Sequence, residues 1–295
     1  MVGGAPLVSV AGVRNAMAGG WDPVTVIDAR DADEIEQIIR TVAEREVQPW
    51  FGRLTAADIA EKGPGDLVTV ADRAAEAALT AALQAVVPGS VTVGEEAVAE
   101  DAAVLEALDG DAPVWVIDPI DGTHNFATDN PRFAMLVALA HKGELLASWT
   151  YAPALDLMAT ARRGAGAYIN GERMRLAPAP ESLRHLDVCT PQQKWWTGPN
   201  RSRFNGLARA GVSLCFFDTS GLEYIELAAG RRSAMILTWE FPWDHAAGVL
   251  LHAEAGGVSL DCDGRPYRLA GGNALPFVVA PDADCAARVH AAMAG

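Results

Sequence analysis

The sequence has few cysteines and no cysteine motif. Its four cysteines (Cys189, Cys215, Cys262 and Cys285) lie far apart and form no C-x-x-C pair, which excludes a zinc ribbon and a thioredoxin-like redox motif. Two bridges are possible by number alone. A chain of 295 residues buries enough apolar surface to fold without them. We therefore expect reduced thiols in the core.

Positive charge is also scarce. Lysine and arginine number 23 against 38 aspartates and glutamates, so the formal net charge is −15. Such an excess repels nucleic-acid backbones at long range, and we expect no nucleic-acid partner. The charge does not exclude a small phosphorylated ligand, because bound cations can reverse the local sign.

Long hydrophobic runs are absent. No apolar stretch approaches the roughly 20 residues of a transmembrane helix, so we expect no membrane partner. Ala16-Met17-Ala18 loosely imitates a signal-peptide cleavage site, but a basic leading segment is missing and Arg14 interrupts the apolar stretch. These features are unlike a secretory signal. We expect a cytoplasmic protein in which residues 1–30, which have no sustained periodicity, form an N-terminal extension.

The remaining pattern predicts an α+β half at 31–177 and an α/β half at 178–295, because Pro178 and Pro180 stiffen the connector between them. A first helix is expected from Asp31 as N-cap, and a second from Thr69 or Asp72 to Val86. Strands are expected at 91–93, 114–117, 133–140, 146–151, 157–161, 167–169, 186–190, 234–238 and 276–280, a polar loop after 190, and helices near 220–229 and from 244.

Three acidic clusters stand where predicted elements begin or end. Glu95 and Glu96 follow a strand, Asp118 and Asp121 follow another, and Asp244 opens a helix. In the second cluster Pro119 fixes the backbone between the two aspartates, and Gly122 lets the chain turn so that backbone N–H groups face an anion. Carboxylate clusters of this kind suit hard divalent cations, namely Mg²⁺ or Mn²⁺.

Five motifs in one order resemble a known family. They are Asp66-Leu67-Val68-Thr69 with Asp72, Gly94-Glu95-Glu96, the run from Trp115 to Phe126, the run from Arg163 to Gly171, and Trp243-Asp244-His245-Ala246-Ala247-Gly248 followed by Glu254-Ala255-Gly256-Gly257. Together they resemble the inositol monophosphatase-like, lithium-sensitive phosphatases over about residues 35–280. The resemblance implies a mixed α/β fold, a layered α-β-α-β-α sandwich of the inositol monophosphatase and fructose-1,6-bisphosphatase type.

The resemblance also implies roles for particular residues. Two or three Mg²⁺ ions would be held by Glu95, Asp118, Asp121, Asp244 and the carbonyl of Ile120. The implied catalytic groups are Thr123, Glu95 and Asp121: Thr123 orients the attacking water, and the backbone amides of Gly122 and Thr123 receive the phosphate. Behind these residues would stand Lys62, Asp72 and Glu96. The family resemblance further implies a homodimer.

The sequence departs from the inositol-specific pattern at one position. Seven residues before Asp244, where inositol-specific members carry a carboxylate that contacts ring hydroxyls, this chain has Leu237. A leucine cannot accept those hydrogen bonds. Glu240 is either a substitute for the lost carboxylate or a solvated loop residue, and both positions are candidate substrate-binding residues. Lys194–Arg203, a basic and aromatic segment, is either a base or second-phosphate contact or a rim loop.

These observations predict a Mg²⁺-dependent phosphomonoesterase for a small phosphorylated polyol, sugar or amino alcohol. The alternative substrates are histidinol phosphate, 3′-phosphoadenosine 5′-phosphate and fructose 1,6-bisphosphate. An alternative from a different class is an added regulatory role in transcription.

Overall fold

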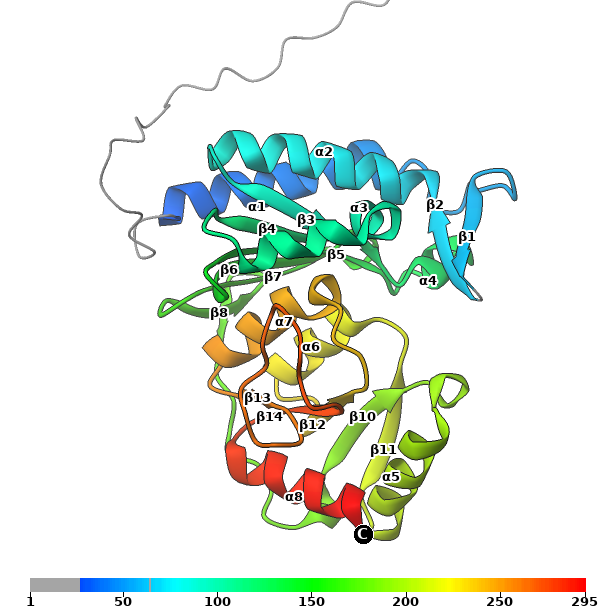
Figure 1. Ribbon diagram of the computed structural model, residues 1–295, viewed down its shortest axis with the longest axis vertical. Helices are drawn as coiled ribbons and strands as arrows, with labels where there is room; N and C mark the ends of the chain where they lie inside the picture. The colour runs from blue at the N-terminus through cyan, green and yellow to red at the C-terminus, as the bar shows by residue number, and fades with distance from the viewer. Residues whose placement is uncertain (1–26, 64) are drawn as a thin grey trace, which may run out of the picture.

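The computed structural model describes residues 27–63 and 65–295, so most of the expected N-terminal extension lies outside the described residues. The chain forms five layers (Figure 1). Helices α1 (Ala29–Val42) and α2 (Val70–Val86) cover a seven-stranded sheet, helices α6 (Ser220–Ala228) and α7 (Pro242–Glu254) form the middle layer, and a five-stranded sheet follows, covered by α5 (Gly198–Arg209) and α8 (Ala283–Ala294). The predicted α-β-α-β-α sandwich is therefore confirmed.

The first helices begin at side-chain caps. Helix α1 starts three residues earlier than predicted: Asp28, not Asp31, is the N-cap, and its carboxylate accepts hydrogen bonds from the backbone of Arg30 and Asp31. The Asp31 carboxylate in return accepts a hydrogen bond from the backbone N–H of Asp28, which completes a capping box. Helix α2 begins as predicted, with Thr69 as N-cap and Asp72 in the reciprocal position.

The seven-stranded sheet has the order β3-β4-β5-β6-β7-β8-β9. Its strands are β3 (Val91–Gly94), β4 (Val114–Asp121), β5 (Ala134–His141), β6 (Glu144–Ala152), β7 (Leu157–Arg162), β8 (Gly166–Ile169) and β9 (Glu172–Met174). Every residue of β4 is buried. Trp115 and Ile117 pack in the core beside α1 and α2, whereas Val114 and Val116 pack in the core beside α6 and α7. Successive side chains of β4 point to opposite faces of the sheet, so this one strand packs against the helices on both sides.

The five-stranded sheet has the order β11-β10-β12-β14-β13. Its strands are β10 (Asp187–Pro191), β11 (Ser213–Phe217), β12 (Ala234–Leu237), β13 (Val258–Leu260) and β14 (Phe277–Ala280). Strands β11, β10 and β12 are parallel, so their carboxyl ends lie at one edge of the sheet. The expected polar loop after residue 190 was wrong in part, because it contains α5, which has Pro199 in its first turn, and the edge strand β11.

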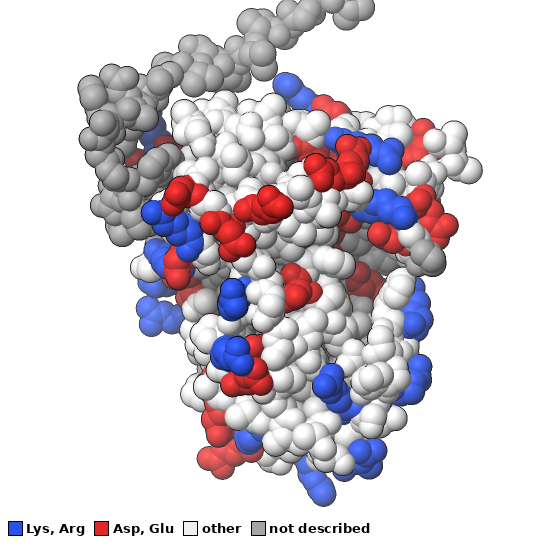
Figure 2. Space-filling model, viewed as in Figure 1, with Lys and Arg blue, Asp and Glu red and all other residues white. Residues whose placement is uncertain are grey.

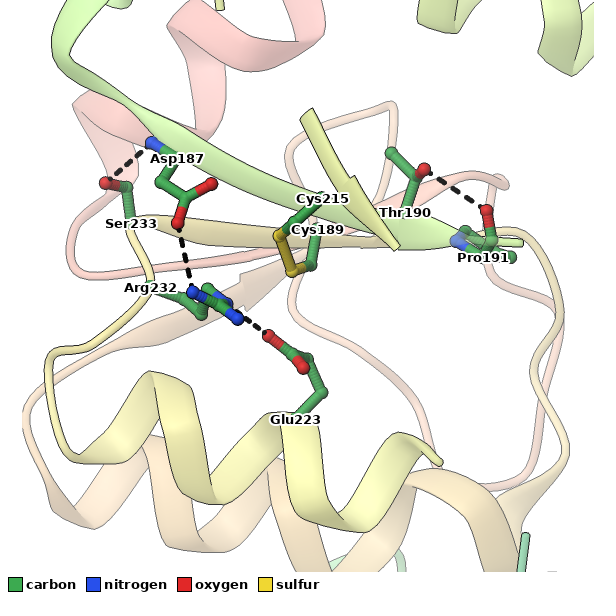
Figure 3. The surroundings of a disulfide bond; sticks show 8 residues. All are labelled: Asp187, Cys189, Thr190, Pro191, Cys215, Glu223, Arg232 and Ser233. Atoms are coloured by element: carbon green, nitrogen blue, oxygen red, sulfur yellow. Dashed lines mark hydrogen bonds and ion pairs between the residues drawn. A yellow bond between two sulfur atoms is a disulfide. The ribbon is translucent and has the colours of Figure 1, made fainter. Parts of the chain in front are cut away.

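The expectation of reduced thiols was wrong for two of the four cysteines. Cys189 and Cys215 form a disulfide between β10 and β11 (Figure 3). The parallel register places the two residues directly opposite each other, with their Cα atoms 4.6 Å apart, a relation that sequence spacing alone does not reveal. Cys262 and Cys285 are free. Beside the bridge, Arg232 joins Asp187 and the buried Glu223.

Two further elements complete the frame of the site. Strands β1 (Ile59–Gly63) and β2 (Asp66–Thr69) form an antiparallel hairpin at one end of the molecule, and the short helices α3 (Glu95–Glu100) and α4 (Thr123–Ala127) follow β3 and β4. Within the described residues, no helix is long and apolar enough to cross a membrane.

Candidate active site

The Asp118–Thr123 segment forms a bulged strand end followed by a tight turn. Strand β4 continues through Asp118 to Asp121, with a shift of register between them, rather than ending at Asp118. Gly122 then adopts φ +87°, and a Cβ atom there would lie 2.2 Å from the Thr219 side chain. Only glycine combines that backbone conformation with so little space. The turn starts α4 at Thr123.

Asp121 joins the two halves of the chain. One carboxylate oxygen accepts a 2.7 Å hydrogen bond from the backbone N–H of Gly221, and the other accepts a 3.3 Å bond from that of Ser220. Both donors lie at the N-terminus of α6, where the helix dipole favours a carboxylate. A Cβ on Gly221 would lie 3.0 Å from Asp121 and 2.4 Å from Leu136, so this approach requires glycine.

Asp244 lies in the first turn of α7 and is held by two neighbours. Its carboxylate accepts a hydrogen bond from the indole N–H of Trp239, and its backbone carbonyl accepts a 3.0 Å bond from the Ser220 hydroxyl. Because Ser220 also contacts Asp121, the starts of α6 and α7 are fixed against the end of β4.

Glu95 and Glu96 open α3 and meet the β1–β2 hairpin. The Lys62 ammonium donates to Glu95 at 2.6 Å and to Glu96 at 3.0 Å. Behind them, the Glu76 carboxylate accepts the backbone N–H groups of Glu96 and Ala97 at 2.8 and 2.9 Å. Glu76 therefore holds the start of α3, and with it the position of Glu95.

The Thr123 hydroxyl lies between the Ile120 carbonyl at the end of β4 and the Asp72 carboxylate of α2. It lies 3.0 Å from the Ile120 carbonyl and 3.3 Å from the Asp72 carboxylate. Asp72 is fully buried and also accepts hydrogen bonds from Thr69. The hydroxyl has one proton to donate, so one of these oxygens receives it while a lone pair remains for an incoming O–H group.

Burial and mutual repulsion raise the pKa values of the carboxyl groups in this cluster. Burial first, and then the charges of Glu95, Asp121 and Asp244, raise the pKa of Asp118 well above its usual range. The pKa of Asp244 is raised for the same reasons, and burial raises the pKa of Asp121 and of Asp72 to about 7. In the view of Figure 2, acidic side chains gather over the half of the molecule that contains the seven-stranded sheet.

The donor set fits hard divalent cations. Carboxylate oxygens are offered by Glu95, Asp118, Asp121 and Asp244. Each of these groups lies close enough to another carboxylate for that charge to raise its pKa, and the Lys62 ammonium acts in the opposite direction on Glu95 and Asp244. Among the described residues, no three of these carboxylates lie within 4.8 Å of one another. Mg²⁺ takes one or two protein carboxylates per ion and keeps several waters, so it does not need three of them at one point. The group found within that distance among the described residues, Cys189, Cys215 and Glu223, has its sulfurs joined and offers no thiolate.

Neither Leu237 nor Glu240, the two candidate substrate-binding residues, has a side chain free to contact a substrate beside the carboxylates. Leu237 has no exposed surface and packs with Tyr224 and Phe277, so its place among the substrate-binding residues needs correction: β12 points this side chain into the core. The Glu240 carboxylate accepts hydrogen bonds from the backbone and side chain of Asn273 at 2.9 and 2.8 Å. It holds the loop before β14.

Sequence reasoning missed Glu76, Ser220, Gly221 and Trp239. Glu76 carried a readable signal, since it lies four residues after Asp72 on the same face of α2. Ser220 and Gly221 act from the start of α6 and Trp239 from the segment after β12, and none of the three had a local signature.

Comparison with known proteins places this geometry in a family. The chain matches the model of the inositol monophosphatase family over residues 21–293. It is 33% identical over 242 residues to the inositol-1-monophosphatase of Mesorhizobium japonicum, a match that covers 79% of this chain and 86% of that protein. It is also 33% identical over 251 residues to the Nus factor SuhB of Pseudomonas aeruginosa, covering 79% and 84% of the two chains.

Solved structures agree. The suhB extragenic suppressor protein of Bartonella henselae has a TM-score of 0.74 at 25% identity, covering 89% of this chain and 98% of that one. An inositol monophosphatase of Thermotoga maritima has a TM-score of 0.73 at 27% identity, covering 90% and 96%. This chain therefore belongs to the inositol monophosphatase family.

Proposed function

We propose that this protein is a Mg²⁺-dependent phosphomonoesterase acting on a small phosphorylated alcohol. One observation carries the proposal: Asp121, next to the Gly122 turn at the end of β4, is hydrogen-bonded to the start of α6, and Ser220 there joins it to Asp244 of α7, so that carboxylates of both halves of the chain meet beside this turn. Family membership supports the same reaction class.

The proposed cations would be held by Glu95, Asp118, Asp121, Asp244 and the Ile120 carbonyl. When bound, they neutralise the phosphate dianion and lower the pKa of the attacking water. Mn²⁺ is the alternative ion, and we expect lithium to inhibit.

The chain's own groups orient the reactants. The Thr123 hydroxyl, fixed between Ile120 and Asp72, accepts a hydrogen bond from the attacking water and so directs its oxygen lone pair. The left-handed turn at Gly122 exposes the first backbone N–H groups of α4, which lack partners within the helix and suit phosphate oxygens. Lys62 screens the remaining negative charge beside Glu95 and Glu96.

Phosphate release across a panel of monoesters, with Mg²⁺ or with a chelator, tests this function. The panel contains inositol 1-phosphate, histidinol phosphate, 3′-phosphoadenosine 5′-phosphate, fructose 1,6-bisphosphate and glycerol 2-phosphate. We expect Mg²⁺-dependent release from at least one ester and none with chelator. No release from any ester at saturating Mg²⁺ would refute the proposal.

The relatives named Nus factor SuhB favour a second candidate function, an added regulatory role in transcription. Because of these relatives, the absence of a nucleic-acid partner that the net charge suggests stays a prediction. A gel-shift titration with structured RNA tests it. Binding that survives Asp121→Asn would assign this role to a surface separate from the phosphatase site.

A further inference from the structure

The edge of the five-stranded sheet that faces the carboxylate cluster is rich in aromatic side chains. Strands β11, β10 and β12 end at Phe217, Pro191 and Leu237, and ligands of such sheets bind outside the carboxyl ends of parallel strands. Helices α6 and α7 start from this edge, and their first turns contact Asp121 and contain Asp244. The edge therefore borders the site from the side opposite β4.

Trp239 is the side chain that follows β12 into the site. Its indole N–H donates to the Asp244 carboxylate, which fixes one edge of the ring at the carboxylate cluster. Its ring centroid lies 6.1 Å from that of Phe217 and 5.5 Å from that of His245, and the residue stays partly exposed. Leu237 is buried, and the Glu240 carboxylate is hydrogen-bonded to Asn273. At the end of β12, the group that can contact a leaving group is therefore the Trp239 ring and not either of these side chains.

A second tryptophan follows β10, the strand beside β12. Trp195 is 54% exposed, whereas the adjacent Trp196 is anchored by a 2.8 Å hydrogen bond to the Pro191 carbonyl and packs on Phe204. The anchored ring holds the segment, and the exposed ring is free for a ligand. A single exposed apolar side chain needs no explanation by itself, so only the position of this ring can indicate a ligand.

Trp195 reaches the opposite half of the molecule. A Cβ atom on Gly65, in the turn between β1 and β2, would lie 3.2 Å from the Trp195 ring. That hairpin also contains Lys62, which binds Glu95 and Glu96. The ammonium of Lys194 lies 5.3 Å from the Trp195 ring centroid. The ring thus lies between the sheet edge and the hairpin of the site's lysine, and a cation stands beside it.

We propose that the leaving-group side of this site binds a flat aromatic ring through Trp239 and Trp195, so that the preferred substrates are phosphate monoesters of ring-bearing alcohols. The proposal rests on the proposed phosphatase function. Stacking on indole requires a π-face and tolerates different rings, so an aryl group, an imidazole and a nucleobase share the required chemistry. The rival reading is a polyol bound by Asp218, an exposed carboxylate after β11.

Two synthetic esters separate ring stacking from size and leaving-group chemistry. Phenethyl phosphate and 2-cyclohexylethyl phosphate both release a primary alcohol, but only the first has a flat π-system. With Mg²⁺, we expect kcat/KM to be about tenfold higher for phenethyl phosphate, as one or two aromatic contacts would give. Inositol 1-phosphate, the polyol probe, should be the poorer substrate of the wild type.

Variants locate the preference. Trp195→Leu should lower the phenethyl-to-cyclohexylethyl ratio about three- to tenfold. Leu155→Ala is the control: Leu155 is 43% exposed and lies in the turn between β6 and β7, outside the segments that carry the two tryptophans, so this change should leave the ratio unchanged. An unchanged ratio in Trp195→Leu, or a wild type that prefers inositol 1-phosphate, overturns the proposal.

A binding measurement keeps this test distinct from the test of phosphatase activity. Calorimetric titration of the Asp121→Asn variant with the two synthetic esters, in the presence of Mg²⁺, needs no turnover. If the wild type hydrolyses nothing but the variant binds phenethyl phosphate about tenfold more tightly, the phosphatase function fails and the aromatic site stands. Equal binding of the two esters, or none, overturns the aromatic site whatever the activity.

Discussion

The two halves of the molecule build their parts of the site in different ways. The half with the seven-stranded sheet supplies its groups from short contiguous segments: Asp118 to Thr123 form the end of β4 and the turn after it, and Glu95 and Glu96 follow the neighbouring strand β3. The half with the five-stranded sheet supplies Ser220 at the start of α6, after β11, and Trp239 and Asp244 in the segment from the end of β12 into α7. Under the proposed function, the first set of segments would bind the cations and the phosphate, and the second would border the leaving group.

The largest predicted effect comes from changing Asp121, the residue through which the two halves contact each other. Asp121→Asn preserves shape but removes one charge from the proposed ion site, and one of the two α6 amides then faces an N–H₂ group instead of an oxygen. We expect kcat to fall about 100- to 1000-fold, the scale of losing one electrostatic contact in an active site. Phosphate release at saturating Mg²⁺ measures it.

The control for that change is Asp284→Asn, which removes a charge from an exposed residue of α8. It should have near-normal activity. Near-normal turnover of Asp121→Asn itself would show that the assigned cation site is wrong.

Leu237→Glu tests whether the five-stranded half can be converted to a polyol site by one substitution. Because Leu237 is fully buried among apolar side chains, we expect the new carboxyl to lower the free energy of unfolding by at least about 3 kcal/mol. Urea unfolding measures the loss, with Leu155→Glu at a 43% exposed position as control. A stable variant with improved inositol 1-phosphate hydrolysis would instead place this side chain at the substrate.

The difference between the halves also explains what the sequence could predict. The layered fold was predicted through the family resemblance that the five motifs carry. The strands next to Asp118 and Glu95 and the cap of α2 by Thr69 follow from local motifs and periodicity. The start of α1 was missed by three residues because Asp28 and Asp31 are both acceptable caps, and packing decides between them.

Relations between distant segments were not predictable. The Cys189–Cys215 bridge depends on the register of β10 and β11, and the orientation of Leu237 depends on which face of β12 meets α6 and α7. Neither the disulfide nor the orientation of Leu237 can be predicted from one sequence, because both depend on how the strands pair in the folded protein.

The disulfide is specific to the five-stranded half and should affect that half alone. Removing both sulfurs in a Cys189→Ala, Cys215→Ala variant releases a loop of 26 residues in sequence separation and should cost about 2–4 kcal/mol of unfolding free energy. Thermal unfolding with and without reductant measures it. The wild type should respond to reductant and the variant should not; a wild type indifferent to reductant would contradict the stabilising role.

Gly122→Ala tests the contiguous turn of the other half. Gly122 and Gly143 both have positive φ, at 87° and 77°, but a Cβ atom would meet Thr219 at the first and nothing within 4 Å at the second. Both alanines incur about 1–2 kcal/mol of backbone strain, and Gly122→Ala adds about 1–3 kcal/mol of overpacking. Chemical unfolding of the pair measures the difference. Equal losses would mean that the loop after β11 moves freely away from the turn.

The pH dependence of stability gives the smallest and sharpest contrast between the halves. Burial lowers the pKa of His252, on α7 against the five-stranded sheet, to about 4, and its ring bonds the Ala280 carbonyl. On α2, burial raises the pKa of Glu76 to about 7. Between pH 6.5 and 4, unfolding lets His252 take up a proton, so acid destabilises its surroundings; Glu76 already binds a proton when folded, so acid stabilises its surroundings in the metal-free protein.

His252→Gln isolates the first effect. Its unfolding free energy relative to wild type should improve by about 1 kcal/mol for each pH unit below 6.5, because one pKa unit corresponds to about 1.4 kcal/mol. Urea titrations at pH 7.5 and pH 5, in chelator, measure the change, and His185→Gln at an exposed position is the control. A constant difference between His252→Gln and wild type across that range would mean that the imidazole is protonated while buried, in which case a carboxylate rather than the Ala280 carbonyl would have to be its partner.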